Sequence, residues 1–333
     1  MNILKWIDEI INATVKKPMP VLSFPGARLL EITVLEMIKS ADNQARCMKA
    51  VADRFDTLAS VSLMDLSVEA EAFGSEVKFG ENDVPTVIGS IVDTKEDAEN
   101  LKIPRVGEGR TGVCIEAIKK AKALITDRPV FAGVIGPFSL SGRLMDMTEI
   151  MVKSLTEPEL THVVLSKATE FITRYALSLK AAGADGLIIA EPAAGLLSPA
   201  ICKEFSSGYV KKIVDAVSDY SFIVIYHNCG NTLPLIDSIL SIGAKAYHFG
   251  NAVDIEEILK KMPSDVPVMG NLSPSEHLLG GTPATVAKAT KQMLKKAKGY
   301  KNYIPSSGCD IPPLTPFENI EAFFETVKNW KWE

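Results

Sequence analysis

The sequence predicts an α/β protein built as a single (β/α)8 TIM barrel. Short β-branched apolar runs alternate with longer helical patterns, and eight such units follow one another along 333 residues. This alternation is typical of parallel strands that helices cover. Gly183 and Gly243 each stand between a helical pattern and an apolar run, as expected of helix C-caps. No GxGxxG motif follows the first run, so an open dinucleotide-binding sheet has no support.

The elements can be assigned in order along the chain. The start, residues 1–17, carries acids inside an apolar stretch and is expected to form an amphipathic N-terminal helix. Helical spacing over 31–55 then separates the first two strands, and an insertion at about 66–127 follows strand two as a hairpin-like excursion over the barrel mouth. We find no domain boundary and expect one domain over 1–333. The predicted strands are 19–24, 59–65, 128–137, 185–192, 221–227, 245–251, 266–271 and 302–309.

Composition narrows the class of function. The formal net charge is −5 and the pI about 5.6, without a long basic patch, so a nucleic-acid partner is not expected. No run of 18 apolar residues occurs, so no membrane span is expected. Five widely spaced cysteines do not form a disulfide framework, which predicts a reducing, cytoplasmic location with free thiols.

One cysteine–histidine constellation stands at the ends of predicted strands. His227 and Cys229 follow the fifth strand in "YHNCGNT", and Cys309 follows the eighth. Active sites of such barrels lie at the carboxyl ends of the strands, and two thiolates with one imidazole suit Zn²⁺ with one position left open. The alternative is a buried apolar cysteine beside a hydrogen-bonded histidine. The third side chain, at a consistent strand end, favours the metal.

Other polar residues at strand ends are candidates for binding substrate. Asp65 ends strand two, Glu191 ends strand four and Asn251 ends strand six. A carboxylate at a barrel mouth is costly unless it is paired or used, so Glu191 is expected to line the pocket, although it could also cap the next turn. Asn231 or Thr232 is expected to cap the helix after strand five, where backbone N–H groups could meet an anionic substrate.

Several sequence blocks resemble the uroporphyrinogen decarboxylase superfamily, and most closely its methylcobamide:coenzyme M methyltransferase branch, over roughly residues 18–330. The blocks are "VEAEAFGSEV" (68–77), "GPFSLSGRL" (136–144), "AGADGLIIAEPAAGLLSP" (182–199), "YHNCGNTLPLIDSI" (226–239), "VPVMGNLSP" (266–274) and "SSGCDIPPLTPFENI" (306–320). The resemblance implies a zinc-dependent TIM barrel that moves a methyl group from a methylcobamide, carried on a corrinoid protein, to a small thiol. It also implies that His227, Cys229 and Cys309 bind the zinc.

The chain departs from this branch at the expected fourth ligand. Similar enzymes supply a glutamate near the end of strand six, where this chain has Asn251. Water, Asn251 or His248 could take the resting fourth position. The segment 22–31 also differs from the usual pattern near the substrate, which leaves the thiol open among coenzyme M, homocysteine and others. A homodimer is a further possibility that the sequence leaves open.

Two other functions remain open from the sequence. A metal-free decarboxylase of an acidic tetrapyrrole would need arginines near the first strand, where this chain has one, Arg28. Decarboxylation also gives no reason for the cysteine–histidine set. A barrel that binds a corrinoid or a metal without turnover is the second alternative, and Asn251 is the feature that favours it.

Overall fold

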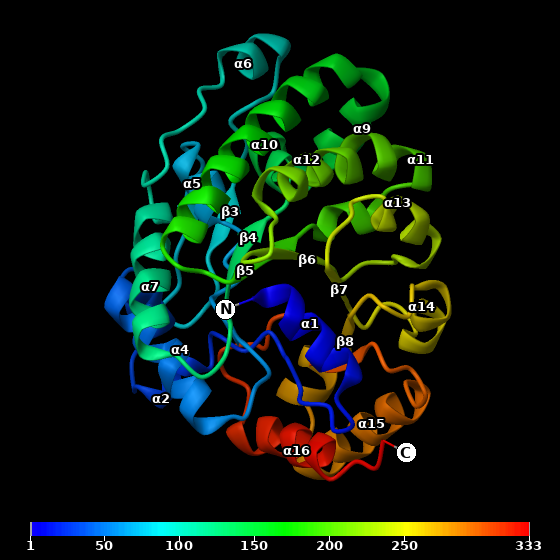
Figure 1. Cartoon of the computed structure of the whole chain (residues 1–333). Coiled ribbons are helices and arrows are strands. Elements are labelled where there is room, and N and C mark those ends of the chain that lie inside the picture. Colours follow the sequence, from blue (N-terminus) through cyan, green and yellow to red (C-terminus); the bar gives the residue numbers. More distant parts are fainter. Residues whose placement is uncertain (1, 333) are drawn as a thin grey trace.

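A curled sheet of seven parallel strands forms the centre of the computed structural model, which describes residues 2–332 (Figure 1). The strands follow one another in chain order, β1-β4-β5-β6-β7-β8-β9, and all six neighbouring pairs are parallel. The α/β class and the parallel sheet are thereby confirmed. The strands are β1 (Ser60–Val61), β4 (Val130–Ile135), β5 (Gly186–Ala190), β6 (Ile223–Asn228), β7 (Ala246–Phe249), β8 (Val268–Leu272) and β9 (Tyr303–Ser307).

The run 19–24 does not form the predicted first strand, so this prediction was wrong. The run nevertheless bridges the two edges of the sheet. Met19 donates its N–H to the Pro305 carbonyl of β9 at 2.9 Å, and Leu58, just before β1, donates to the Pro18 carbonyl at 2.8 Å. Pro18 and Pro305 have no N–H, so a regular ladder cannot form on either side. The run together with Pro18 is called the seam below.

Helices surround the sheet and connect its strands (Figure 1). Their apolar faces and the outward sides of the strands form one large buried cluster. The helices are α1 (Ile3–Asn12), α2 (Gly26–Leu29), α3 (Val34–Ile38), α4 (Ala41–Arg54), α5 (Val68–Ala72), α6 (Lys95–Asn100), α7 (Thr111–Leu124), α8 (Pro137–Met145), α9 (Met147–Thr156), α10 (Pro158–Ala181), α11 (Pro199–Cys202), α12 (Gly208–Val217), α13 (Ile236–Leu240), α14 (Ile255–Lys261), α15 (Pro283–Lys296) and α16 (Phe317–Lys328). Short 3-10 turns, η1 (Pro192–Leu196) and η3 (Leu233–Leu235), and π-helical turns, η2 (Lys203–Ser207) and η4 (Pro274–Leu279), complete the connections.

Helix α1 closes the end of the sheet at which the strands begin. Figure 1 shows it, in dark blue, across the middle of the ring of strands. Its buried residues are Ile3, Trp6, Ile7 and Ile10, and each such side chain contributes roughly 1.5–3 kcal/mol. They contact apolar side chains inside the ring: Phe131, Ile188, Ile223, Ile225, Ala246, Met269 and Ile304. The helix is shorter than the predicted 1–17, and residues 1 and 333, the limits of the predicted domain, lie outside the described residues.

The Lys16 side chain fastens the end of α1. Its Nζ donates to the carbonyl oxygens of Ile10 and Ile11, both at 2.8 Å, and of Lys301 at 2.6 Å. Lys16 is only 7% exposed. A cation at a helix C-terminus satisfies carbonyls that have no partner within the helix. This side chain therefore ties α1 to the loop that precedes β9.

The insertion between β1 and β4 contains α5, α6, α7 and a hairpin. Strands β2 (Glu76–Lys78) and β3 (Thr86–Ile88) of this hairpin are antiparallel, with Val77 opposite Val87. Arg110, at the start of α7, stacks over the Phe79 ring at 5.0 Å. Arg110 also forms ion pairs next to β1, so it links the hairpin to the central sheet.

Within residues 2–332, none of the helices has both the length and the apolar character that crossing a membrane requires.

Candidate metal and substrate site

The carboxyl ends of β6 and β9 bring three predicted ligands together. His227 is the fifth residue of β6, Cys229 follows that strand, and Cys309 follows β9 by two residues. One ligand atom from each lies within 4.8 Å of the others, and His227 Nε2 is 3.6 Å from Cys309 Sγ. His227 is 3% exposed, whereas both cysteines are half-buried. The three donors therefore converge at the end of the ring opposite α1.

Close backbone contacts hold the two cysteines in place. A Cβ built on Gly250, directly after β7, would lie 2.4 Å from Cys229 Cα. A Cβ on Gly308 would lie 2.8 Å from both the backbone nitrogen and the side-chain oxygen of Asn251. Asn271 of β8 fixes the loop after β7 by donating to the Gly250 carbonyl at 2.9 Å. Glycine is thus required on the β7 side of Cys229 and directly before Cys309, because no room for a side chain exists there.

The two thiols influence each other's ionisation. A hydrogen bond from Cys309 lowers the pKa of Cys229, and His227 adds to this effect. The same hydrogen bond, together with burial, raises the pKa of Cys309. The pair therefore gives up one proton readily and resists losing the second, because two thiolates this close repel. A divalent cation removes that repulsion, and the soft N/S₂ donor set suits Zn²⁺, so the residues present fit this metal.

His248, one of the open alternatives for a fourth ligand, has both ring nitrogens engaged elsewhere. Its Nδ1 lies 2.7 Å from His227 Nδ1, and its Nε2 lies 2.8 Å from Ser306 Oγ. Burial and the neighbouring His227 lower the pKa of His248 well below 6.5. His248 therefore stands behind His227, on the side away from the cysteines, and is a neutral ring. The sequence did not single out Ser306.

Asp65 follows β1, near the strand end where it was predicted. Both of its carboxylate oxygens bind other groups of this chain. Its carboxylate forms an ion pair with Arg110 and accepts from the Ser67 N–H and hydroxyl at 3.0 and 2.6 Å. Arg110 also pairs with Glu71 at 2.6 Å. Both Asp65 and Arg110 are buried. No sequence pattern indicated Arg110 as the partner of Asp65, because 45 residues separate the two.

Glu191 also lies away from solvent. It is 0% exposed, and its two carboxylate oxygens accept from the backbone N–H groups of Phe138 and Ser139 at 3.0 and 2.6 Å. These donors are at the first turn of α8, where a helix attracts a carboxylate. Burial nevertheless raises the pKa of Glu191 to about 7. These contacts hold Glu191 against the first turn of α8, and its role in binding substrate stays a prediction.

The two predicted asparagines differ in position. Asn231 is exposed and caps no helix; Thr232 stands at the N-cap of η3 without a side-chain cap bond. Asn251 is exposed beside Gly308 and lines a cleft of about 570 Å³ together with Asn271 and Ser273. Asn251 therefore borders the three-ligand cluster, whereas Asn231 lies on the outer surface of the next turn.

A smaller cleft lies between the end of β1 and the hairpin. It has a volume of about 190 Å³ and is lined by Met64, Leu66, Ser67, Arg143 and residues 84–87. The Met64 backbone lies beside the carboxylate of Asp310, the residue after Cys309. Arg143 has no ion-pair partner among residues 2–332 and is half-buried. The cleft thus combines a free cation with apolar walls close to the cysteine loop.

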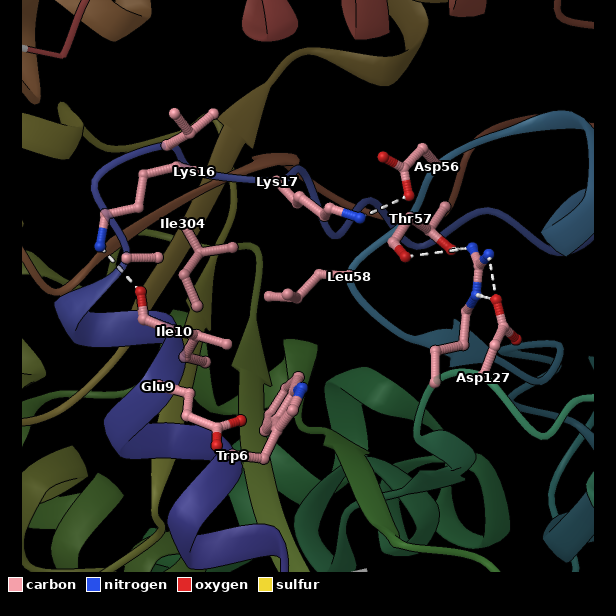
Figure 2. Close-up of a pocket in the computed structure, with 13 residues that line it drawn as sticks. Trp6, Glu9, Ile10, Lys16, Lys17, Asp56, Thr57, Leu58, Asp127 and Ile304 are labelled. Atoms are coloured by element: carbon pink, nitrogen blue, oxygen red, sulfur yellow. Dashed lines mark hydrogen bonds and ion pairs between the residues drawn. The ribbon is translucent and has the colours of Figure 1, made fainter.

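Another cavity, of about 310 Å³, lies at the opposite end of the ring, beside α1 (Figure 2). Trp6, Ile10, Leu58 and Ile304 form its apolar wall. Charged groups on its rim pair with one another: Figure 2 shows Lys17 directed toward Asp56, and the two are 2.8 Å apart. Arg128 pairs with Asp127. This cavity is remote from the three ligands, as expected for the stabilising end of a barrel.

The sequence of this chain is similar to one protein family and to several of its members. The family model described as uroporphyrinogen decarboxylase (URO-D) matches residues 13–330. The methylcobamide:CoM methyltransferase MtbA of Methanosarcina acetivorans is 32% identical over 272 residues, which cover 80% of this chain and 78% of that protein. A uroporphyrinogen decarboxylase of Anaeromyxobacter dehalogenans is 27% identical over 314 residues, covering 91% and 89%.

Solved structures share the fold. A methyltransferase from Methanosarcina mazei superposes with a TM-score of 0.86 at 24% identity, covering 98% of this chain and 97% of the other. A B12-independent methionine synthase from Shewanella sp. superposes with a TM-score of 0.59 at 13% identity, covering 95% and 96%. At these identities the likeness concerns the fold alone.

Proposed function

The chain belongs to the uroporphyrinogen decarboxylase family, and within it we propose that this protein is a zinc-dependent methyltransferase that moves a methyl group from a methylated corrinoid to a small thiol. The observation that carries the proposal is the convergence of one ring nitrogen of His227 and the sulfurs of Cys229 and Cys309 within 4.8 Å. A relative at 32% identity is named for this activity. Tetrapyrrole decarboxylation gives no reason for such a donor set.

The three side chains would hold Zn²⁺ and leave one position for the acceptor. Zinc bound there would lower the pKa of a coordinated thiol and so supply a thiolate. With two cysteinates and a neutral imidazole, the ligands cancel the charge of the metal, so the acceptor sulfur retains its electron density. Asn251 contributes an amide oxygen at most, which is a poor zinc ligand. The residues of this chain thus serve to deprotonate and orient the acceptor.

The methyl transfer is a displacement at carbon. The acceptor sulfur forms a bond to the methyl carbon while the cobalt–carbon bond breaks, and cobalt leaves with both electrons as Co(I). The thiol proton passes to solvent water before the attack. Positioning the sulfur in line with the cobalt–carbon bond is the main contribution expected of the protein.

The methyl donor must approach from outside the ring. α1 fills the opposite end, and the clefts near the ligands, about 190 and 570 Å³, are narrow spaces suited to small molecules. A corrin macrocycle therefore docks over the mouth, carried by a separate corrinoid protein. Because thiolate ligands need a reducing compartment, we place the reaction in the cytoplasm.

The cleft beside Met64 suggests the kind of acceptor. Arg143 offers a guanidinium there that has no ion-pair partner among residues 2–332, and Arg binds anionic oxygens by paired hydrogen bonds. We therefore expect a thiol that also carries an anionic group. Coenzyme M, homocysteine and cysteamine differ in the charge opposite the thiol, so a comparison of the three tests this expectation.

Metal analysis combined with a methylation assay tests the function. We expect one zinc per chain and methylation of a thiol by methylcobalamin. Cys309→Ser should lose at least about 100-fold in activity together with its zinc, because zinc affinity depends on the full donor set. Cys202→Ser is the matched control, since Cys202 is 0% exposed beside Ser207 and away from the cluster.

Three results would contradict the proposal in different ways. Absence of zinc with unchanged activity of Cys309→Ser would remove the metal from the reaction. Turnover of uroporphyrinogen in the presence of a chelator would favour the decarboxylase. Zinc and cobalamin binding without methylation of any thiol would indicate a binding protein without turnover.

A further inference from the structure

A line of buried polar groups runs from the seam to His227. The Ser306 hydroxyl of β9 lies 2.8 Å from the Met19 carbonyl oxygen of the seam. His248 Nε2 lies 2.8 Å from Ser306 Oγ, and His248 Nδ1 lies 2.7 Å from His227 Nδ1. His227, His248 and Ser306 are 3%, 1% and 0% exposed. The contacts therefore have to be satisfied among these groups, without bulk water.

The sheet register creates this line. His227 of β6 and His248 of β7 are paired residues in the parallel ladder, so their side chains point to the same face. Their rings are 4.6 Å apart and inclined by 64°. Ser306 reaches the far side of His248 from β9. Three strands thus contribute one group each.

Counting protons fixes the direction of every bond. The Met19 carbonyl can only accept, so the single Ser306 hydroxyl proton points to it. Ser306 Oγ must then accept from His248 Nε2–H. The two Nδ1 atoms, 2.7 Å apart, share one proton. This proton lies on His227, because His227 Nδ1 also faces the His248 carbonyl oxygen, which can only accept, so His248 Nδ1 is the acceptor. The His248 carbonyl, 3.2 Å from His227 Nδ1, is a second, weaker acceptor for the same proton.

We propose that His248, supported by Ser306 and the Met19 carbonyl, is a positioning residue that fixes His227 as the Nδ1–H tautomer and so directs the Nε2 lone pair toward Cys229 and Cys309. This inference rests on the zinc site of the proposed function. His248 does not touch the metal or the substrate. It sets the protonation of the ligand in advance, so binding a metal requires neither a proton shift nor a rotation of the ring.

The effect on metal affinity follows from the general behaviour of such partners. Removing the group that hydrogen-bonds a ligating histidine weakens metal binding by about 10- to 100-fold. We expect this range for His248→Phe, which fills the space but has no acceptor. Ser306→Ala removes the acceptor of His248 and frees that ring to change tautomer, so a smaller loss is expected. His162→Gln, on α10 beside Tyr209, is the control.

Two measurements on the full chain separate this inference from the proposed function. Nitrogen NMR shifts of the His227 ring report its tautomer in the metal-free protein, and competition with a chromophoric chelator gives the zinc dissociation constant. We expect Nδ1–H in the wild type, with Nε2–H appearing and zinc binding weakening in His248→Phe while the midpoint of urea denaturation confirms the fold.

The possible results distinguish a failure of this inference from a failure of the proposed function. A wild-type protein with His227 in the Nε2–H form overturns the inference, as does a His248→Phe variant with unchanged tautomer and zinc affinity. If the wild type binds no zinc, the proposed function fails while the tautomer still decides the role of His248. If His248→Phe does not fold, Ser306→Ala provides the same two measurements.

Discussion

Gly250→Ala is expected to weaken zinc binding through steric pressure on one ligand. Gly250 follows β7, and its N–H donates to the Asn228 carbonyl of β6 at 3.1 Å. An added Cβ would lie 2.4 Å from Cys229 Cα and 2.6 Å from Cys229 Cβ. Carbon atoms in ordinary contact are about 3.5–4.0 Å apart, so the ends of β6 and β7 must separate by about 1 Å. No flexible side chain can absorb this shift.

The size of the effect can be worked from that displacement. Overpacking of this kind costs about 1–3 kcal/mol, and metal–ligand distances tolerate only about 0.2 Å. Because a bound metal fixes the distances to its ligands, moving Cys229 by about 1 Å strains the metal-bound protein more than the metal-free protein. At about 1.4 kcal/mol for each factor of ten, zinc should bind about 10- to 100-fold more weakly. The φ angle of Gly250 is not positive, so backbone conformation adds no further cost.

Competition with a chromophoric chelator measures this change, and urea denaturation of the metal-free protein measures stability. Gly208→Ala is the control, because Gly208 is exposed at the start of α12 and an added Cβ would lie 3.3 Å from the Lys203 carbonyl oxygen. An unchanged zinc dissociation constant in Gly250→Ala would refute the reasoning. Equal weakening in both variants would refute it too, because the effect would then be unrelated to Cys229.

Two further predictions concern stability. Lys16→Met leaves three main-chain carbonyl oxygens without their donor and should lower the free energy of unfolding by about 3–5 kcal/mol in urea. Lys17→Met, which removes only an exposed pair, should change it by less than about 1 kcal/mol, and similar losses in both would contradict the role of Lys16. Burial raises the pKa of Glu69 to about 7, so the folded state retains a proton that the unfolded state releases above about pH 4.5, and stability falls as the pH rises toward 7. Glu69→Gln should remove a slope of up to about 1.4 kcal/mol per pH unit in this window, and an identical pH profile of the urea midpoint would contradict it.

Strands β5 and β6 were predictable because each contains an apolar run that covers both faces. All six residues of β6 are buried, and the unbroken run was visible in the sequence. The seam has an equally apolar sequence but no ladder. Pro18 was a visible warning, whereas Pro305 mattered only once β9 became its neighbour. Hydropathy alone therefore predicted burial correctly here and hydrogen bonding incorrectly.

In the candidate site, only the residues that directly follow strands could be placed from the sequence. His227, Cys229 and Cys309 follow strands of one parallel sheet, so their proximity could be expected from topology, and their role as zinc ligands stays a prediction. The partners of Glu191 could not be foreseen, because the N-terminus of α8 lies more than 50 residues earlier in the chain. The contact between His227 and His248 depends on the register of β6 and β7, which no local pattern specifies.

The seam also has a consequence for the order in which the protein is made. On the two edges of the sheet its backbone partners include Leu58 and the Pro305 carbonyl, and the latter is synthesised nearly 290 residues after Met19. Synthesis proceeds from the N-terminus, so α1 and the seam leave the ribosome long before the strand that completes their surroundings. The Met19 carbonyl gains its hydrogen bond from Ser306, and His227 its contact with Cys309, only after nearly the whole chain has been synthesised. Until β4 and the later strands have been synthesised, the apolar face of α1 lacks the side chains that cover it in the folded protein.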